Sequence, residues 1–393
     1  MRWAYIKNGD VVSQLERVDA DDAKDIDGGP DAFLVDFLTE NKGQPIFLLS
    51  CGSRDESYQT DTIDARVKRV TGPALSNVKK LLLQLQLITS SFSEIKRFSP
   101  DRIICGRIGP LLWVCFVLSK LYSIPLIHSR HNSVDEHNSS WPRKLLMAID
   151  SLLLKRIEGV ICHGPYLKDQ MINRAGVQPS KVVEFDVGYQ SYLNSPEQSV
   201  DSKLPPNPNA RYLFFIGRVS AIKGIFDLLD ALEALLLKHS DIYLVVVGKG
   251  EHSSRLDQEV ARRNLDDRVI RLGFCPTQEI SSLLKQAHLL ITPTRKEFPE
   301  GRCMVVMEGL VMGVPVIAPN YGPFPFLVKD DTNGILYEPN STQQLQAGID
   351  ALLTDDKQYK RLAEGAHQSG QSLLEPELRF SQAANTLFDQ LGA

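Results

Sequence analysis

The chain has 393 residues, of which 43% are hydrophobic and 23% charged, and its formal net charge is −4. This composition is typical of a globular protein with two domains and argues against a disordered chain. Because the sequence has no long run of Lys and Arg, it gives no electrostatic argument for a nucleic-acid partner.

Along the first half of the chain, short β-branched runs alternate with longer helical patterns. This alternation predicts a parallel sheet with helices on both faces. Strands are expected at residues 3–6, 45–50, 66–70, 102–105, 125–129, 159–162 and 182–185. Helices are expected between them at residues 31–40, 76–97, 110–122, 142–156 and 165–174.

A polar, proline-rich stretch at residues 195–210 then interrupts the pattern and is predicted to be a linker. A second alternating series follows, with strands expected at 212–216, 242–247, 269–272, 289–292, 315–318 and 334–337. Its helices are expected at 223–239, 253–264, 277–286, 304–312, 342–353 and 356–372. We therefore expect an α/β fold with two Rossmann-like, doubly wound domains, 1–194 and 211–375, facing a central cleft, and a final helix within 376–393.

The N-terminus lacks the apolar core of a signal peptide, and the apolar stretch 110–125 is shorter than the roughly 20 residues that a membrane span needs. The six cysteines form no C-x-x-C pair, which favours free buried thiols in a reducing compartment. A cytoplasmic location is expected.

The first motif of the second domain is G-R-V-S-A-I-K-G, directly after the strand 212–216. Gly217 permits a tight turn, Arg218 can bind two phosphate oxygens, and Lys223 adds a positive charge beside a predicted helix start. Taken alone, the motif also fits a solvated basic loop. Two further strands end in glycines, at Gly248 in V-V-V-G-K-G and before Phe274 in R-L-G-F.

The second motif is T-R-K-E-F-P-E-G-R-C-M-V-V-M-E, which leads from a strand into a helix predicted to begin near Cys303. A helix start favours a bound phosphate, whereas carboxylates repel phosphate and accept hydrogen bonds from hydroxyls. Glu300 before the helix and Glu308 inside it therefore suit a nucleotide sugar, which combines a diphosphate with sugar and ribose hydroxyls. Two unrelated surface charges remain the alternative for this pair.

Residues 212–354 resemble the retaining glycosyltransferases of GT-B fold, in the sucrose-synthase-like and mannosyltransferase-like group known as glycosyltransferase family 4. The resemblance rests on the ordered motifs G-R-x4-K-G, V-V-V-G-K-G and E-x7-E. Arg302 and Cys303 stand where the family usually has a small or aromatic residue followed by glycine. The resemblance implies transfer of a hexose-type sugar with retention of configuration, no cofactor, no metal, and a C-terminal helix that crosses back to the first domain.

The resemblance also implies the role of each site residue. Arg218 and Lys223 would bind the donor diphosphate, Glu300 would face the transferred sugar and Glu308 the ribose. The implied catalytic residues are Arg218, Lys223, Glu300 and His131. The implied donor-binding residues are Gly217, Gly248, Phe274, Gly301, Arg302, Cys303, Met304 and Glu308.

The first domain is similar to the family's acceptor half. Gly28 and Gly29 resemble the family's Gly-Gly loop on the acceptor side, and His131 resembles the histidine that faces the donor sugar. The partners implied are a UDP- or GDP-type nucleotide sugar and a hydroxyl acceptor, either a glycan, a lipid-linked sugar or a small molecule. Polysaccharide or glycoconjugate biosynthesis is the expected context, with contact at the inner face of the membrane if the acceptor is lipid-linked.

Two other functional classes remain open. A non-catalytic GT-B scaffold would keep the fold without using the charged motifs. An NAD-dependent oxidoreductase would need a G-x-G-x-x-G sequence after a strand, which is absent here. The histidines and acidic residues between 128 and 137 lack the spacing of a metal site, so no metal is expected.

Overall fold

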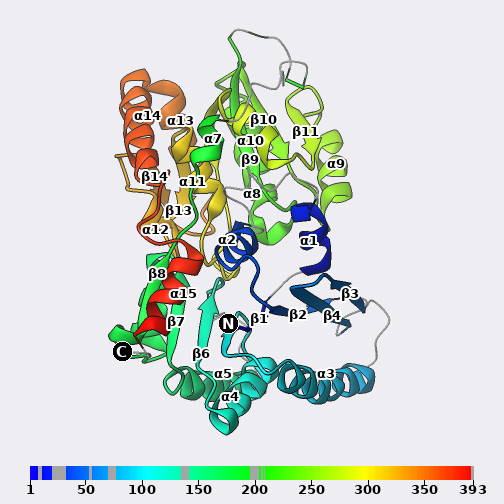
Figure 1. Cartoon of the computed structure of the whole chain (residues 1–393). Coiled ribbons are helices and arrows are strands. Elements are labelled where there is room, and N and C mark those ends of the chain that lie inside the picture. The colour runs from blue at the N-terminus through cyan, green and yellow to red at the C-terminus, as the bar shows by residue number, and fades with distance from the viewer. Residues whose placement is uncertain are drawn as a thin grey trace. The chain divides into compact units, whose positions relative to one another are not determined.

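The computed structural model describes residues 1–7, 11–19, 32–52, 55–69, 77–133, 141–194, 203–204, 207 and 209–390. The chain divides into two compact units, which are drawn in Figure 1. Unit 1 takes its described residues from 1–186 and 377–393, and unit 2 from 187–376. The first predicted domain extended to residue 194. Gly28 and Gly29 lie outside the described residues.

The described part of unit 1 contains an eight-stranded sheet in the order β3-β4-β2-β1-β5-β6-β7-β8. Its strands are β1 (Trp3–Ile6), β2 (Ile46–Gly52), β3 (Glu56–Gln59), β4 (Ile63–Arg69), β5 (Arg102–Cys105), β6 (Leu126–Arg130), β7 (Gly159–His163) and β8 (Val182–Phe185). All neighbours pair in parallel except β3, which pairs antiparallel with β4. The sequence did not predict β3, because E-S-Y-Q has little apolar side-chain area to bury.

The two faces of this sheet carry different side chains. In β1, Ala4 and Ile6 join an aliphatic core formed mainly with α3 (Asn77–Phe98) and α4 (Pro110–Tyr122). Trp3 and Tyr5 point to the opposite face, as alternation along a strand requires. There they make edge and tilted contacts with aromatic rings of the helices α2 (Ala32–Glu40) and α15 (Phe380–Asp389).

The C-terminal helix α15 belongs to unit 1, as the resemblance predicted, and lies beside β7 and β8 (Figure 1). The backbone N–H of Ser381 donates to Asp36 in α2 at 2.7 Å. A Cβ added to Gly159 in β7 would lie 2.6 Å from Leu387 of α15. The remaining helices of unit 1 are α1 (Val11–Asp19), α5 (Trp141–Leu154) and α6 (Pro165–Asp169), which a π-helical turn at Gln170–Arg174 follows.

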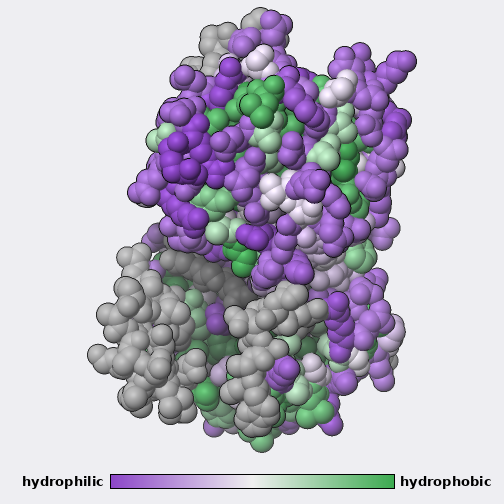
Figure 2. Space-filling view, turned by 180° about the vertical axis from the view of Figure 1, so that it is seen from behind, coloured by the Kyte–Doolittle hydropathy of each residue, from purple (hydrophilic) through white to green (hydrophobic). Residues whose placement is uncertain are grey.

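The described part of unit 2 contains a six-stranded parallel sheet in the order β11-β10-β9-β12-β13-β14. Its strands are β9 (Arg211–Ile216), β10 (Ile242–Val247), β11 (Val269–Gly273), β12 (Ala287–Ile291), β13 (Val316–Pro319) and β14 (Gly334–Tyr337). Its helices are α7 (Gln190–Asn194), α8 (Ile225–Leu235), α9 (Ser253–Arg262), α10 (Thr277–Leu284), α11 (Met304–Val311), α12 (Phe324–Leu327), α13 (Thr342–Thr354) and α14 (Asp356–Gln371). Aliphatic residues gather between sheet and helices, whereas the face of this unit that Figure 2 shows is mostly hydrophilic, with scattered hydrophobic residues.

The two units confirm the predicted fold class, but some predicted starts differ from the structure: the last helix, expected from about Pro376, begins at Phe380, and the strand expected from Arg66 begins at Ile63. The helix expected from residue 223 begins at Ile225, because Ala221–Lys223 forms a 3-10 turn and Gly224 adopts a φ of 74°. Among the described residues, no helix is long and apolar enough to cross a membrane.

Candidate active site

The candidate site lies where the strand order of unit 2 reverses. From β9 the sheet continues to β10 and β11 on one side and to β12, β13 and β14 on the other. Ligands of open α/β sheets bind beyond the carboxyl ends of the strands at such a point. The loops that follow β9 and β12 contain the two motifs that the sequence singled out.

These two loops are held together through their backbones. The N–H of Arg295 after β12 donates to the carbonyl of Ile222 after β9 at 3.0 Å. A Cβ added to Gly224 would lie 1.8 Å from the carbonyl oxygen of Pro293. Likewise, a Cβ added to Gly248 would lie 2.0 Å from the carbonyl oxygen of Gly217. Glycine is therefore required at positions 224 and 248 so that the motif loops can approach one another.

Lys223 and Glu300 form an ion pair where the loops after β9 and β12 meet, a place called the corner below. The Nζ atom of Lys223 lies 2.5 Å from Oε2 of Glu300, and the two side chains are 18% and 12% exposed. The same Nζ lies 4.0 Å from the ring centre of Phe298, and the Arg218 guanidinium carbon lies 5.8 Å from that ring. Two cations thus lie near one aromatic ring, and one of them is also paired with a carboxylate.

Two aromatic residues of this corner were missed by the sequence reasoning. Phe298 is the ring just described, and the hydroxyl of Tyr321 donates to the carbonyl of Arg295 at 2.9 Å. Tyr321 thereby fixes the loop that carries Phe298 and Glu300. The only signal for Phe298 was an apolar ring in an otherwise polar loop, and Tyr321 lies beyond the motif.

The helix α11 begins directly after this loop. Cys303 is its N-terminal flanking residue, and no side chain caps the helix start. Gly301, Arg302 and Cys303 are buried, and Met304, the first helical residue, is partly buried. Burial raises the pKa of the Cys303 thiol, so the thiol stays neutral, and the positive end of the helix dipole is left for an anion.

Glu308 lies inside α11 and is buried, with 7% of its surface exposed. Burial raises the pKa of its carboxyl to about 7, and the neighbouring Tyr192 hydroxyl of α7 offsets part of that rise. The sequence did not reveal this contact, because Tyr192 belongs to a segment assigned to the end of the first domain.

Arg218 shares the Phe298 ring with Lys223 but is exposed. The other predicted residues lie at other strand ends of unit 2 or in unit 1. Phe274 is 74% exposed and follows Gly273 at the end of β11. In unit 1, His131 follows β6, with Nε2 2.6 Å from the Ser129 hydroxyl. Burial lowers the pKa of His131 well below its usual value, so its ring is neutral at pH 7.

Comparison with protein families accounts for both halves of the chain. Residues 197–369 match the model described as glycosyl transferases group 1, and residues 34–184 match that of glycosyltransferase family 4. The chain belongs to the family-4-like glycosyltransferases of GT-B fold.

The relatives of this glycosyltransferase are distant. It is 24% identical to the α-D-kanosaminyltransferase of Streptomyces kanamyceticus over 67% of this chain and 70% of that relative. Several other curated relatives are matched over about half of their length. Sucrose-phosphate synthase from Thermosynechococcus elongatus has a TM-score of 0.73 at 17% identity and covers 100% of this chain and 99% of its own. HepE from Anabaena, solved with UDP and glucose, has a TM-score of 0.69 at 20% identity with 100% coverage of both chains.

The family match concerns the fold and the class of enzyme, and the role of each site residue in this glycosyltransferase stays a prediction. Within the described residues, no group of three or more His, Cys, Asp or Glu could hold a metal ion.

Proposed function

We propose that the chain is a retaining glycosyltransferase that moves a hexose-type sugar from a nucleoside-diphosphate sugar to a hydroxyl acceptor. The observation that supports this most is the Lys223–Glu300 pair, which lies at the reversal of strand order before the uncapped start of α11. The HepE neighbour was solved with UDP-glucose, so a UDP-sugar is the first donor to test.

In this reaction the bond between the anomeric carbon and the diphosphate oxygen breaks as the acceptor oxygen bonds to the same carbon. Lys223, Arg218 and the start of α11 stabilise the charge on the departing diphosphate, an effect worth several kcal/mol in preorganised sites. A donor phosphate oxygen takes the acceptor proton, and attack from the leaving-group side gives retention. No step uses a metal ion.

Donor binding changes the partner of Lys223 in this proposal. A phosphate oxygen competes with Glu300 for the ammonium group, and Glu300 is then free to accept hydrogen bonds from sugar hydroxyls. His131 is proposed to orient the same sugar, and Glu308 to bind the ribose hydroxyls.

A thermal-shift panel with UDP, GDP, ADP, NAD and nucleotide sugars tests the donor. A ligand at about 100 times its Kd should add about 2.7 kcal/mol of stability. A shift with one nucleoside diphosphate that Glu308→Ala removes would support the donor site and identify the base. A shift with NAD alone would contradict the proposal, and no shift at all would favour the non-catalytic scaffold. The anomeric configuration of the product and a reaction in EDTA test retention and metal independence.

If the acceptor is lipid-linked, unit 1 is proposed to touch the inner face of the membrane. The outer surfaces of α4 and α5 expose apolar side chains, including Leu121 (64%), Leu145 (50%) and Leu152 (51%). Leu121→Glu should reduce coflotation with anionic vesicles, whereas Leu237→Glu, at an 88% exposed position in unit 2, should not. Recovery of the wild-type chain only in the soluble fraction would end this part of the proposal.

A further inference from the structure

A small cavity of about 150 Å³ lies at the carboxyl ends of β5 and β6 in unit 1. Residues 106–108 after β5 and residues 128–133 around the end of β6 line it. It lies next to β1, from which the strand order runs in both directions, so it occupies a position where α/β sheets bind ligands. Since pockets for whole ligands start at about 300 Å³, this volume suits a single functional group of a larger molecule.

Arg130, the last residue of β6, lines this cavity and is only 7% exposed. It forms no hydrogen bond or ion pair with any described residue, and its Nε is fully buried without a partner. His128 lies two residues earlier on the same face of the strand. It is 1% exposed, and within the described residues neither ring nitrogen has a hydrogen-bond partner of good geometry, although the backbone of Cys105 acts to raise its pKa. An unpaired buried cation is strongly unfavourable unless a ligand completes it.

The carboxylate of Asp150 in α5 influences Arg130 electrostatically but does not pair with it. Oδ1 of Asp150 accepts hydrogen bonds from the N–H of Gly109 at 3.0 Å and from Nε1 of Trp113 at 2.8 Å. Asp150 is thus committed to the start of α4. Arg107, a second guanidinium on the lining, adds to the positive charge of the cavity.

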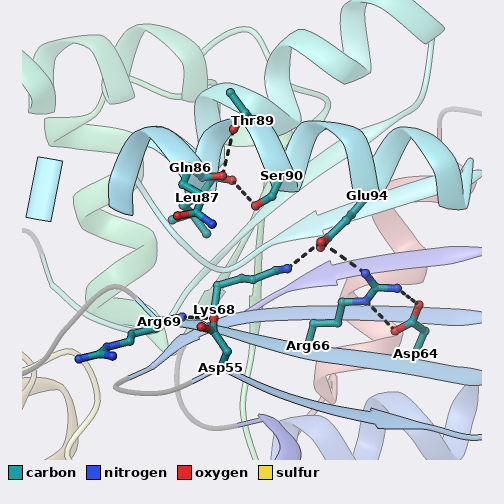
Figure 3. Close-up of polar contacts among 10 residues, drawn as sticks. All are labelled: Asp55, Asp64, Arg66, Lys68, Arg69, Gln86, Leu87, Thr89, Ser90 and Glu94. Carbon is teal, nitrogen blue, oxygen red and sulfur yellow. Dashed lines mark hydrogen bonds and ion pairs between the residues drawn. The ribbon is translucent and has the colours of Figure 1, made fainter. Parts of the chain in front are cut away.

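A larger polar cavity in the same unit shows the opposite arrangement. It has about 620 Å³ and lies between α3 and the strands β3 and β4. Figure 3 shows that two of its cations, Arg66 and Lys68, are paired with carboxylates of the chain. Arg66 pairs with Asp64 at 2.8 Å, and Lys68 pairs with Glu94 at 2.6 Å. An anionic ligand would have to break these pairs, whereas at Arg130 it would break none.

We propose that the cavity at Arg130 and His128 binds an anionic group of the acceptor, either a phosphate or a carboxylate. The assignment to the acceptor rests on the proposed transferase function, while the anion site itself rests on the geometry. The guanidinium donates two parallel hydrogen bonds to two oxygens of such a group. Burial lowers the pKa of His128 to about 3, so at pH 7 its neutral ring supplies one N–H donor.

Calorimetric titration of the full chain tests the anion site with three probes, namely glucose 1-phosphate, glucuronate and neutral methyl glucoside. Each titration is run with and without UDP, because phosphates could also bind beside Lys223 and Arg218. We expect at least one anionic probe to bind in the presence of UDP, and methyl glucoside to bind much more weakly. Arg130→Met should weaken anion binding by about tenfold or more, and Arg130→Lys should restore part of it.

The melting temperature of the unliganded protein gives an independent readout. Arg130→Met removes an unpaired buried charge, so the variant should melt at the same or a higher temperature. A large drop, anion binding that persists in Arg130→Met, or equal binding of methyl glucoside would overturn the proposal. UDP binding by the same variants is scored separately. If UDP fails to bind while the anion still needs Arg130, the transferase proposal is wrong and the anion site stands.

Discussion

The candidate sites of the two units differ in whether their cation has a carboxylate partner. In unit 2, Lys223 is already paired with Glu300 at 2.5 Å, so a ligand must exchange one partner for another. In unit 1, Arg130 is more deeply buried than Lys223 but has no carboxylate partner among the described residues. A paired cation suits a reaction step in which the cation exchanges its carboxylate partner for a ligand oxygen. An unpaired cation suits recognition of a group that stays bound and unchanged.

The largest effect that tests this comparison is on turnover. Lys223→Ala should lower kcat by about a hundred- to a thousandfold, because a preorganised charge on the leaving group is lost. Initial rates with the donor identified by thermal shift measure it. Lys238→Ala is the matched control, since that lysine pairs with Asp350 at 2.7 Å on the surface and its loss should leave the rate unchanged. Normal turnover in Lys223→Ala would refute the assigned role.

The next effect is on stability and concerns the backbone of unit 2. Gly224 and Gly43 have similar φ values of 74° and 80°, but only Gly224 is crowded, with nothing within 4 Å of a Cβ added to Gly43. Gly43→Ala should cost about 1–2 kcal/mol for the left-handed backbone alone. Gly224→Ala should cost about 3 kcal/mol or more, because overpacking against Pro293 is added. Denaturant titration of both variants measures the two losses in free energy of unfolding. Equal losses would show that the two loops can move apart at no cost in stability.

The sequence predicted unit 2 better than unit 1, for physical reasons. The G-R-x4-K-G and E-x7-E motifs place glycines and charges at strand ends within short segments, so local order along the chain was enough to anticipate that Lys223 and Glu300 belong to one site. In unit 1 the strand β3 and the helix α1 were not predicted, and in unit 2 only the short helices α7 and α12 were missed among the described elements. Their sequences have weak or short apolar patterns, and they are stabilised by pairing or packing with other elements.

Within the sites, what the sequence could not show are contacts between distant segments. The position of Phe298 under two cations depends on how two loops approach, and the cover over Glu308 comes from Tyr192, more than a hundred positions away. Likewise, the isolation of Arg130 depends on Asp150 being committed to Gly109 and Trp113. A short stretch of sequence does not show whether a charged side chain will form an ion pair with a residue far away along the chain.

A smaller effect on stability follows from the buried carboxyl of Glu308. Its pKa is raised from 4.5 to about 7 by burial, so the folded protein holds a proton that the unfolded chain releases. The stability linked to this group is fully present below the unfolded pKa and is lost as the pH rises through about 7. Glu308→Gln should therefore be more stable than wild type near about pH 9, by about 3 kcal/mol at most, and similar near about pH 4.

Denaturant midpoints at the two pH values measure this difference. Glu338→Gln, at an exposed position of the same unit, serves as the control and should give no gain at high pH. A gain of equal size at both pH values would mean that Glu308 does not change its charge on unfolding. The carboxyl would then be ionised before any ribose binds.

The smallest expected effect concerns the ring that joins the two cations of unit 2. Phe298→Leu keeps an apolar side chain but removes the ring face 4.0 Å from Lys223. A cation–π contact at a partly exposed site is worth about 1 kcal/mol, so donor affinity should fall about fivefold while kcat changes little. Tyr243→Leu removes a similar contact with Arg268 at 5.1 Å. Tyr243 lies at the start of β10, away from the candidate site at the carboxyl ends of the strands, so this variant should leave donor affinity unchanged. If Phe298→Leu instead lowers kcat as much as Lys223→Ala does, the ring positions Lys223 for the chemical step and does more than add affinity for the donor.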